Sequence, residues 1–268
     1  MGKDNNEIFE LHNYLNTNSS SELVVEEIVK NIPDLEDIGF AGCLEKDWLK
    51  TLLKGFILDK NSDNQHYSYN PEYEKKVREI CEETLKQCKG YINKKIHIFL
   101  FPTFSKFVIE KMGGVNGFSS WHGTLWIFVN FVRGWEDSLK ETIVHELAHA
   151  VSPFYKGGDF VIGYGLILDG IAEHFKDYII PNKRSSWTQA ISEKKAWEMF
   201  RELKDSLTIK DFNKYNELFY GTGKYPLWAG YTIGYYLVKE YLKKQRYIDW
   251  NGLLRKNPKD ILKEIEHQ

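Results

Sequence analysis

The chain has 268 residues, of which 42% are hydrophobic, enough to bury one sizeable core or one core with a smaller subdomain. Its 36 lysines and arginines nearly balance 38 acidic residues, so the net charge of −2 gives no electrostatic case for nucleic acid or an anionic membrane as a partner. The first residues lack the pattern of a signal peptide, and no apolar run has bilayer length. We expect a cytoplasmic protein; the composition leaves its oligomeric state open.

The first 90 residues contain no recognisable motif and read as helical. Apolar residues at helical spacing predict two short helices between Ser21 and Leu58. A third helix is predicted to open at Pro71 and to end at Gly90. We therefore expect an N-terminal helical subdomain over 1–90, followed by a second domain over 91–268.

Three cysteines, Cys43, Cys81 and Cys88, are odd in number and lack metal-ligand spacing. They are predicted to be reduced thiols that serve as small buried hydrophobic residues.

The second domain begins with β-like runs and continues with helices. Ile96 to Phe101 reads as a buried strand that Pro102 stops, and Trp121 to Asn130 as a second run that forms a hairpin or an irregular edge strand. Helical patterns follow, near 136–151, 165–180, 187–204, 227–244 and 258–266. The predicted class is α+β, with many helices around a small mixed sheet.

The candidate metal-binding and catalytic residues lie in the segment 143–150, which reads Ile-Val-His-Glu-Leu-Ala-His-Ala. Four residues advance a helix by about 400°, so His145 and His149 lie on one face and can share one ion. Imidazole suits Zn²⁺, and Glu146 can then accept the proton of a zinc-bound water. Two histidines and a glutamate on an apolar helix are costly to bury without partners, which favours a metal site over incidental residues.

A catalytic zinc usually takes a third protein ligand and keeps one position open. Glu173, on a packed helix 24 residues after His149, is the candidate, and His174 is an alternative about 100° further around the helix. Asp177 lies one turn beyond Glu173 and can accept the distal ring N–H of a ligand histidine, with His145 as the favoured partner. Alternatively, Asp177 is a solvated charge near the end of the helix.

The HExxH helix followed by Glu173-x-x-x-Asp177 resembles the gluzincin class of metallopeptidases, of which thermolysin is a member. Three blocks, which begin at His145, Asp169 and Trp228, together resemble the bacterial YjaZ-like family of predicted zinc-dependent proteases. The resemblance spans roughly 91–268 and implies a zincin-like core, in which a small sheet and the active-site helix are closed by C-terminal helices. It also implies a peptide or protein substrate.

Three further features are candidates for supporting roles. In gluzincins a phenol or imidazole from the C-terminal part stabilises the oxyanion, and Tyr231 is the candidate here, although Tyr231 and Tyr235 can equally be core residues. Gly230 and Gly234 form a small-residue seam that permits close approach to a neighbouring helix. Residues 117–122 are expected near the cleft if an edge strand there pairs with an extended peptide.

The sequence therefore predicts a peptidase that holds one Zn²⁺ through His145, His149 and Glu173, with Glu146 as general base. Two alternatives are left open: a non-catalytic or regulatory zinc-binding protein of the same fold, and a structural zinc closed by a fourth protein ligand.

Overall fold

A computed structural model describes residues 8–16, 22–31, 46–57, 70–119, 123–155, 161–181 and 184–266. The chain divides into two compact units, 1–146 and 147–268, and the division falls inside helix α5 (Trp135–Val151).

The N-terminal unit is built on a mixed four-stranded sheet, which confirms the predicted class. Its strands run in the order β1 (Phe9–Asn13), β2 (Ile96–Pro102), β4 (Thr124–Val129) and β3 (Val115–Phe118). β1, β2 and β4 are parallel, whereas β3 pairs antiparallel with β4. Of the two arrangements expected for Trp121 to Asn130, the hairpin is confirmed, because β3 and β4 are consecutive antiparallel strands; the edge strand is β3, since β4 is paired on both sides.

Strand β1 has no counterpart in the sequence-based expectations, which placed only helices in 1–90. It pairs with β2 in register, with Glu10 opposite His97 and His12 opposite Phe99. The domain boundary near residue 90 stays a prediction.

The two faces of this sheet differ in chemistry because side chains alternate along each strand. One face stacks aromatic rings, among them Phe99, Phe101, Phe118, Trp126 and Phe128. On the other face, Ile127 and Gly117 lie against Thr142 and Glu146 of α5.

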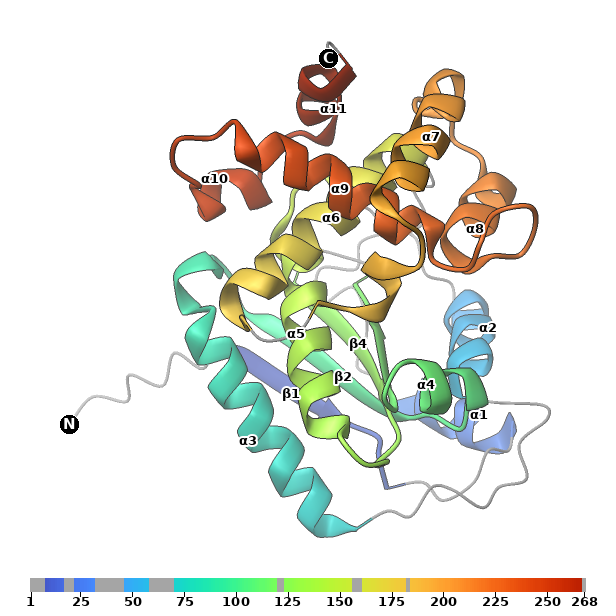
Figure 1. Cartoon of the computed structure of the whole chain (residues 1–268). Coiled ribbons are helices and arrows are strands. Elements are labelled where there is room, and N and C mark those ends of the chain that lie inside the picture. The colour runs from blue at the N-terminus through green and yellow to red at the C-terminus, as the bar shows by residue number, and fades with distance from the viewer. Residues whose placement is uncertain are drawn as a thin grey trace. The chain divides into compact units, whose positions relative to one another are not determined.

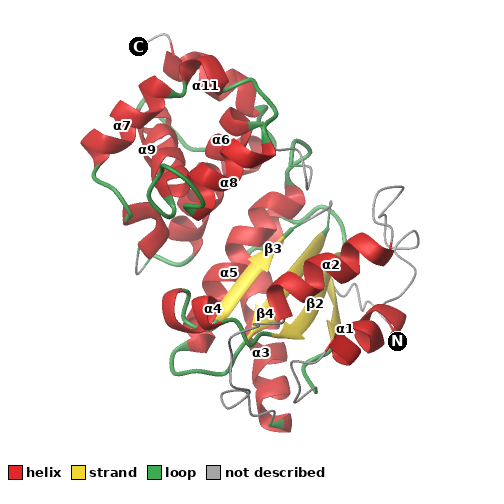
Figure 2. Ribbon diagram, turned by 90° about the vertical axis from the view of Figure 1, so that its right-hand side faces the viewer, coloured by secondary structure: helices red, strands yellow, loops and turns green. Residues whose placement is uncertain are grey.

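Helices cover both faces. α3 (Pro71–Gln87) and α5 lie on one side, and α1 (Glu22–Asn31) and α2 (Lys46–Ile57) on the other, as Figures 1 and 2 show together. The short helix α4 (Lys106–Lys111) lies beside β3.

Helix α3 begins where the sequence predicts. The Asn70 side chain accepts the backbone N–H of Glu72, and Pro71 fills the first turn. Its buried face includes Cys81, and Cys88 follows the last turn; both thiols are free, and burial raises the pKa of each to about 12. This confirms two of the three predicted thiols, while Cys43 lies outside the described residues.

The C-terminal unit is helical. Its helices are α6 (Ile162–Ile179), α7 (Glu193–Glu202), α8 (Phe212–Tyr220), α9 (Ala229–Lys243), α10 (Trp250–Leu254) and α11 (Pro258–Glu266). Short 3₁₀ turns also occur in the described part of the chain, at Lys89–Tyr91, Ser186–Gln189 and Lys204–Ser206. The helix predicted over 187–204 divides into the second of these turns and α7, and α8 and α10 were not predicted because each is too short for a clear period.

Helices α6 and α9 pack so closely that their backbones are in contact at two glycines. A Cβ built at Gly234 would lie 2.1 Å from the Leu166 carbonyl oxygen, and one at Gly170 would lie 2.3 Å from the Gly234 carbonyl oxygen. The predicted close approach at Gly234 is thus confirmed, whereas Gly230 accommodates the ring of Phe219.

We expect Gly234→Ala to lower the free energy of unfolding by at least about 1–3 kcal/mol, because backbone atoms cannot move aside for the new methyl group. Gly55→Ala in α2 is the control, since a Cβ there meets nothing within 4 Å and should stabilise the helix by about 0.5–1 kcal/mol. Urea unfolding measures both. Equal effects of the two substitutions would contradict the packing described.

Among the described residues, no helix is both long and apolar enough to cross a bilayer.

Candidate metal centre

The two histidines of the HExxH segment lie on one helix, as predicted. α5 opens with Glu136 and Asp137 in its first turn, where carboxylates favour the positive end of the helix dipole. His145 and His149 are one turn apart in its last part, with only 8% and 4% of their surfaces exposed. Both imidazoles are therefore withdrawn from bulk solvent.

A carboxylate from α6 joins this pair. Asp169 Oδ1 lies 3.4 Å from His149 Nε2, and Asp169 is itself buried. One ligand atom from each of His145, His149 and Asp169 lies within 4.8 Å of the other two. Two imidazoles and one carboxylate form the donor set of a catalytic zinc site, so these residues fit that ion.

Asp169 had no assigned role in the sequence-based prediction. The available signal was an acidic residue inside the apolar stretch from Leu166 to Ile171, since carboxylates are rarely buried without a partner. It stands one turn before Glu173, on the same face of α6.

Glu146 is also buried, with 6% of its surface exposed. The edge strand β3 passes close to it: a Cβ built at Gly117 would lie 2.9 Å from Glu146 Cγ and 2.6 Å from Thr142 Cγ2. Gly117 thus lies beside α5, while the expectation that residues 117–122 lie near a substrate cleft stays a prediction. Of the predicted segment 117–122, residues 120–122 lie outside the described residues.

Besides its contact with Asp169, the imidazole of His149 has a second neighbour that the sequence did not predict. Its imidazole stacks on the ring of Tyr155, with centroids 4.1 Å apart and planes 25° apart. Stacking restricts rotation of the imidazole and so helps fix the direction of its ring nitrogens.

Glu173 is fully buried and is held by three groups of its own unit. Trp187 Nε1 donates to Oε1 at 2.6 Å, and Ser185 Oγ donates to Oε2 at 2.8 Å. The buried Lys176 ammonium lies 3.3 Å from the same Oε2. The structure groups Asp169 with the histidine pair, and the role of Glu173 as the third ligand stays a prediction.

The other two candidates on α6, Asp177 and His174, also have partners within the C-terminal unit, and their predicted roles stay predictions. Asp177 Oδ1 pairs with Lys176 Nζ at 2.9 Å, and its side chain is 27% exposed. His174 Nε2 lies 2.9 Å from the Tyr235 carbonyl oxygen and its ring stacks on Tyr235, while burial lowers the pKa of the imidazole.

Tyr231 and Tyr235 lie one turn apart on α9, both partly buried. Tyr231 packs edge-on against Phe219, with ring centroids 5.1 Å apart. The Arg184 guanidinium lies 3.9 Å from the Tyr235 ring centre, and burial raises the pKa of the Tyr235 phenol.

The turn before α9 has a strained backbone. Trp228 has φ of 64°, the only non-glycine residue with positive φ in the described part of the chain. Its ring lies edge-on to Trp187, the residue that donates to Glu173. Strain of this kind costs about 1–3 kcal/mol and often lies beside functional groups.

Comparison with known proteins gives one match. A family model described as "Predicted Zn-dependent protease (DUF2268)" matches residues 77–263, more than half of the chain. No curated protein and no solved structure matches the chain.

Proposed function

Because the chain belongs to this family of predicted zinc-dependent proteases, we propose that it is a zinc-dependent peptidase of the gluzincin type whose active centre lies on helix α5. The observation that carries the proposal is the buried grouping of His145, His149 and Asp169 around one face of that helix. Glu146 follows the first histidine directly, where a general base is needed.

Two carboxylates compete for the third ligand position. We favour Asp169, because its Oδ1 is 3.4 Å from a ring nitrogen of His149. Glu173 is the alternative that the gluzincin resemblance suggests; to bind the ion it would have to give up contacts to Ser185, Trp187 and Lys176. In the favoured arrangement Glu173 anchors α6 to the segment 184–190, and Asp177 helps to neutralise Lys176.

Zinc bound by these residues would supply a Lewis acid that lowers the pKa of water toward about 7 and polarises the scissile carbonyl. Glu146 would accept the proton of the attacking water and deliver it to the leaving amine. The buried surroundings strengthen these charge interactions. Tyr231 is the proposed donor to the developing oxyanion.

The edge strand β3 offers a mode of substrate binding. Among the described residues β3 pairs with β4 alone, so its other edge can accept an extended peptide through backbone hydrogen bonds. Gly117 brings this strand against α5 beside Glu146. A peptide added to β3 would thereby run close to the general base.

A substitution at Gly117 tests this proximity. Gly117→Ala should reduce kcat, because the new methyl group would press on Glu146 Cγ and Thr142 Cγ2. Adding Thr142→Ser removes one of these contacts and should recover part of the lost rate. Unchanged kinetics in Gly117→Ala would contradict the placement of β3 beside Glu146.

The proposal as a whole is tested by digesting a peptide library with wild type and with His149→Ala, and identifying the cut bonds by mass spectrometry. Wild type should cleave internal or terminal peptide bonds, and His149→Ala should not. Circular dichroism checks that His149→Ala is folded. If zinc-loaded wild type cuts no more bonds than His149→Ala does, the non-catalytic alternative is favoured.

A further inference from the structure

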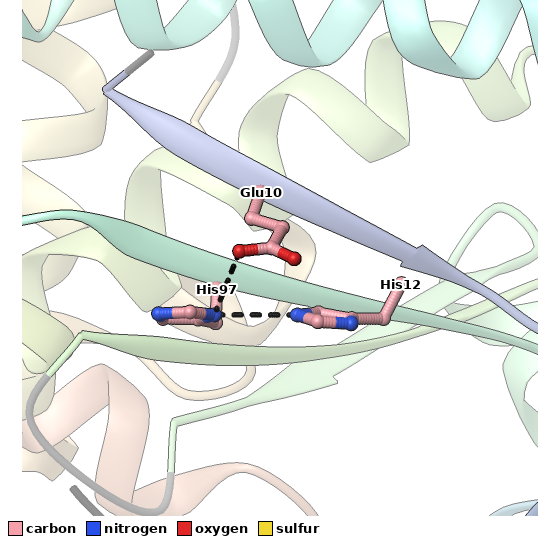
Figure 3. Close-up of side chains that lie close together, drawn as sticks. All are labelled: Glu10, His12 and His97. Atoms are coloured by element: carbon pink, nitrogen blue, oxygen red, sulfur yellow. Dashed lines mark hydrogen bonds and ion pairs between the residues drawn. The ribbon is translucent and has the colours of Figure 1, made fainter. Parts of the chain in front are cut away.

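A second group of metal-binding side chains lies on the sheet of the N-terminal unit. Glu10 and His12 come from β1 and His97 from β2, and a ligand atom from each lies within 4.8 Å of the other two. Figure 3 shows the carboxylate of Glu10 and the ring of His12 both directed at His97. We propose that Glu10, His12 and His97 form a second metal site, for one first-row divalent transition-metal ion such as Zn²⁺.

The backbone brings these residues together by simple rules. Glu10 and His12 are two positions apart on β1, so their side chains leave the same face of the sheet. His97 is the register partner of Glu10 on the neighbouring parallel strand and shares this face. Residues separated by 85 positions in the sequence thus meet on two adjacent strands.

The distances suit a tetrahedral ion. His12 Nε2 and His97 Nδ1 are 3.2 Å apart, and Glu10 Oε2 is 3.9 Å from the same His97 nitrogen. Bonds of about 2.0–2.1 Å at the tetrahedral angle put two ligand nitrogens about 3.3 Å apart. The imidazole pair therefore has the spacing of two zinc ligands, and it needs little movement to bind.

Packing holds the imidazoles in place. The His12 ring stacks on Phe99, with centroids 4.4 Å apart and planes 11° apart, and it also stacks on His97. The His97 side chain is 16% exposed, whereas that of Glu10 is 45% exposed. Solvent therefore reaches the site from the Glu10 side, where water can complete the coordination.

The donor set also suits a transition metal, because an imidazole binds through a nitrogen lone pair and a carboxylate through an oxygen. Two imidazoles and one carboxylate select Zn²⁺, Co²⁺, Ni²⁺ or Cu²⁺ over Mg²⁺ and Ca²⁺.

One neighbouring charge opposes the cation. Lys95 Nζ lies 2.6 Å from Glu10 Oε2, and its side chain is 46% exposed. A half-exposed lysine can turn into solvent when an ion arrives, but its charge should weaken binding. Removing Lys95 should therefore raise the affinity for the ion, whereas removing a ligand should lower it.

The decisive experiment counts ions. Equilibrium dialysis of the full chain against Zn²⁺, followed by metal analysis, should give two ions per chain for wild type and one for His12→Phe. Phenylalanine keeps the stack on Phe99 but has no ring nitrogen, so His12→Phe should fold and should keep the ion on α5. Excess zinc should raise the melting temperature of wild type more than that of His12→Phe, because only wild type can link β1 to β2 through the metal.

Two lysine variants add a matched comparison. Lys95→Ala should tighten binding of the second ion by about two- to fivefold, the range of an exposed charge pair. Lys94→Ala removes the adjacent lysine and should leave the affinity unchanged. An ion count and affinity in His12→Phe equal to those of wild type would overturn the proposal and leave the cluster as a histidine–histidine hydrogen bond, whereas one ion in wild type and none in His12→Phe would count against the α5 site alone. Neither outcome depends on peptidase activity.

Discussion

Replacing Glu146 with glutamine is expected to reduce peptide cleavage by about 10²- to 10⁴-fold, the usual contribution of a positioned general base. Glutamine has nearly the same shape but cannot accept the proton of the attacking water. Zinc content should stay at the wild-type level, because His145, His149 and Asp169 are untouched. Cleavage is followed with a substrate from the library digest, and zinc by metal analysis of the same sample.

Glu141→Gln provides the control for this change. It makes the same substitution on the same helix, but Glu141 lies about 140° around the axis from Glu146. Its rate should remain near that of wild type. Undiminished cleavage by Glu146→Gln would exclude the general-base role.

The second large effect concerns the third ligand. Asp169→Asn should lower zinc affinity by more than the about 10- to 100-fold that loss of an outer-shell partner costs, because it removes a direct ligand. Competition with a chromogenic chelator measures this affinity. Peptide cleavage should fall in parallel at limiting zinc.

Glu173→Gln is the matched comparison one turn away. Breaking a buried ion pair costs up to about 3–5 kcal/mol, and here somewhat less, because Asp177 stays beside Lys176. We therefore expect lower stability in urea but nearly unchanged zinc affinity. Loss of zinc from Glu173→Gln, with retention in Asp169→Asn, would assign the ligand to Glu173 instead.

The histidine pair could be predicted because its geometry is local. Spacing within one helix places His145 and His149 on the same face whatever surrounds the helix. The third ligand, a carboxylate, could not be predicted in this way. Asp169 and Glu173 share a face of α6, and only the packing of α6 decides which of them reaches His149.

The partners of Glu173 illustrate why the sequence was insufficient. Ser185 and Trp187 follow it by 12 and 14 residues, in a segment whose pattern predicted only the start of a helix. Their hydrogen bonds depend on how that segment folds back, which periodicity does not encode.

Strand β1 was missed for a related reason. Its five residues, Phe-Glu-Leu-His-Asn, are short and half polar, and they become a strand by pairing with β2. That pairing is non-local, and it also creates the cluster of Glu10, His12 and His97. The edge position of β3 and the internal position of β4 likewise follow from strand order, which no single segment specifies.

The most direct test of the central claim is a zinc titration of metal-free wild-type protein and of metal-free His12→Phe while the rate of peptide cleavage is recorded. The rate should rise from near zero with added zinc and reach its plateau at one equivalent in His12→Phe, where only the α5 site can bind. A rate that is already maximal without zinc, or one that stays at zero after the α5 site is filled, would contradict a zinc-dependent peptidase.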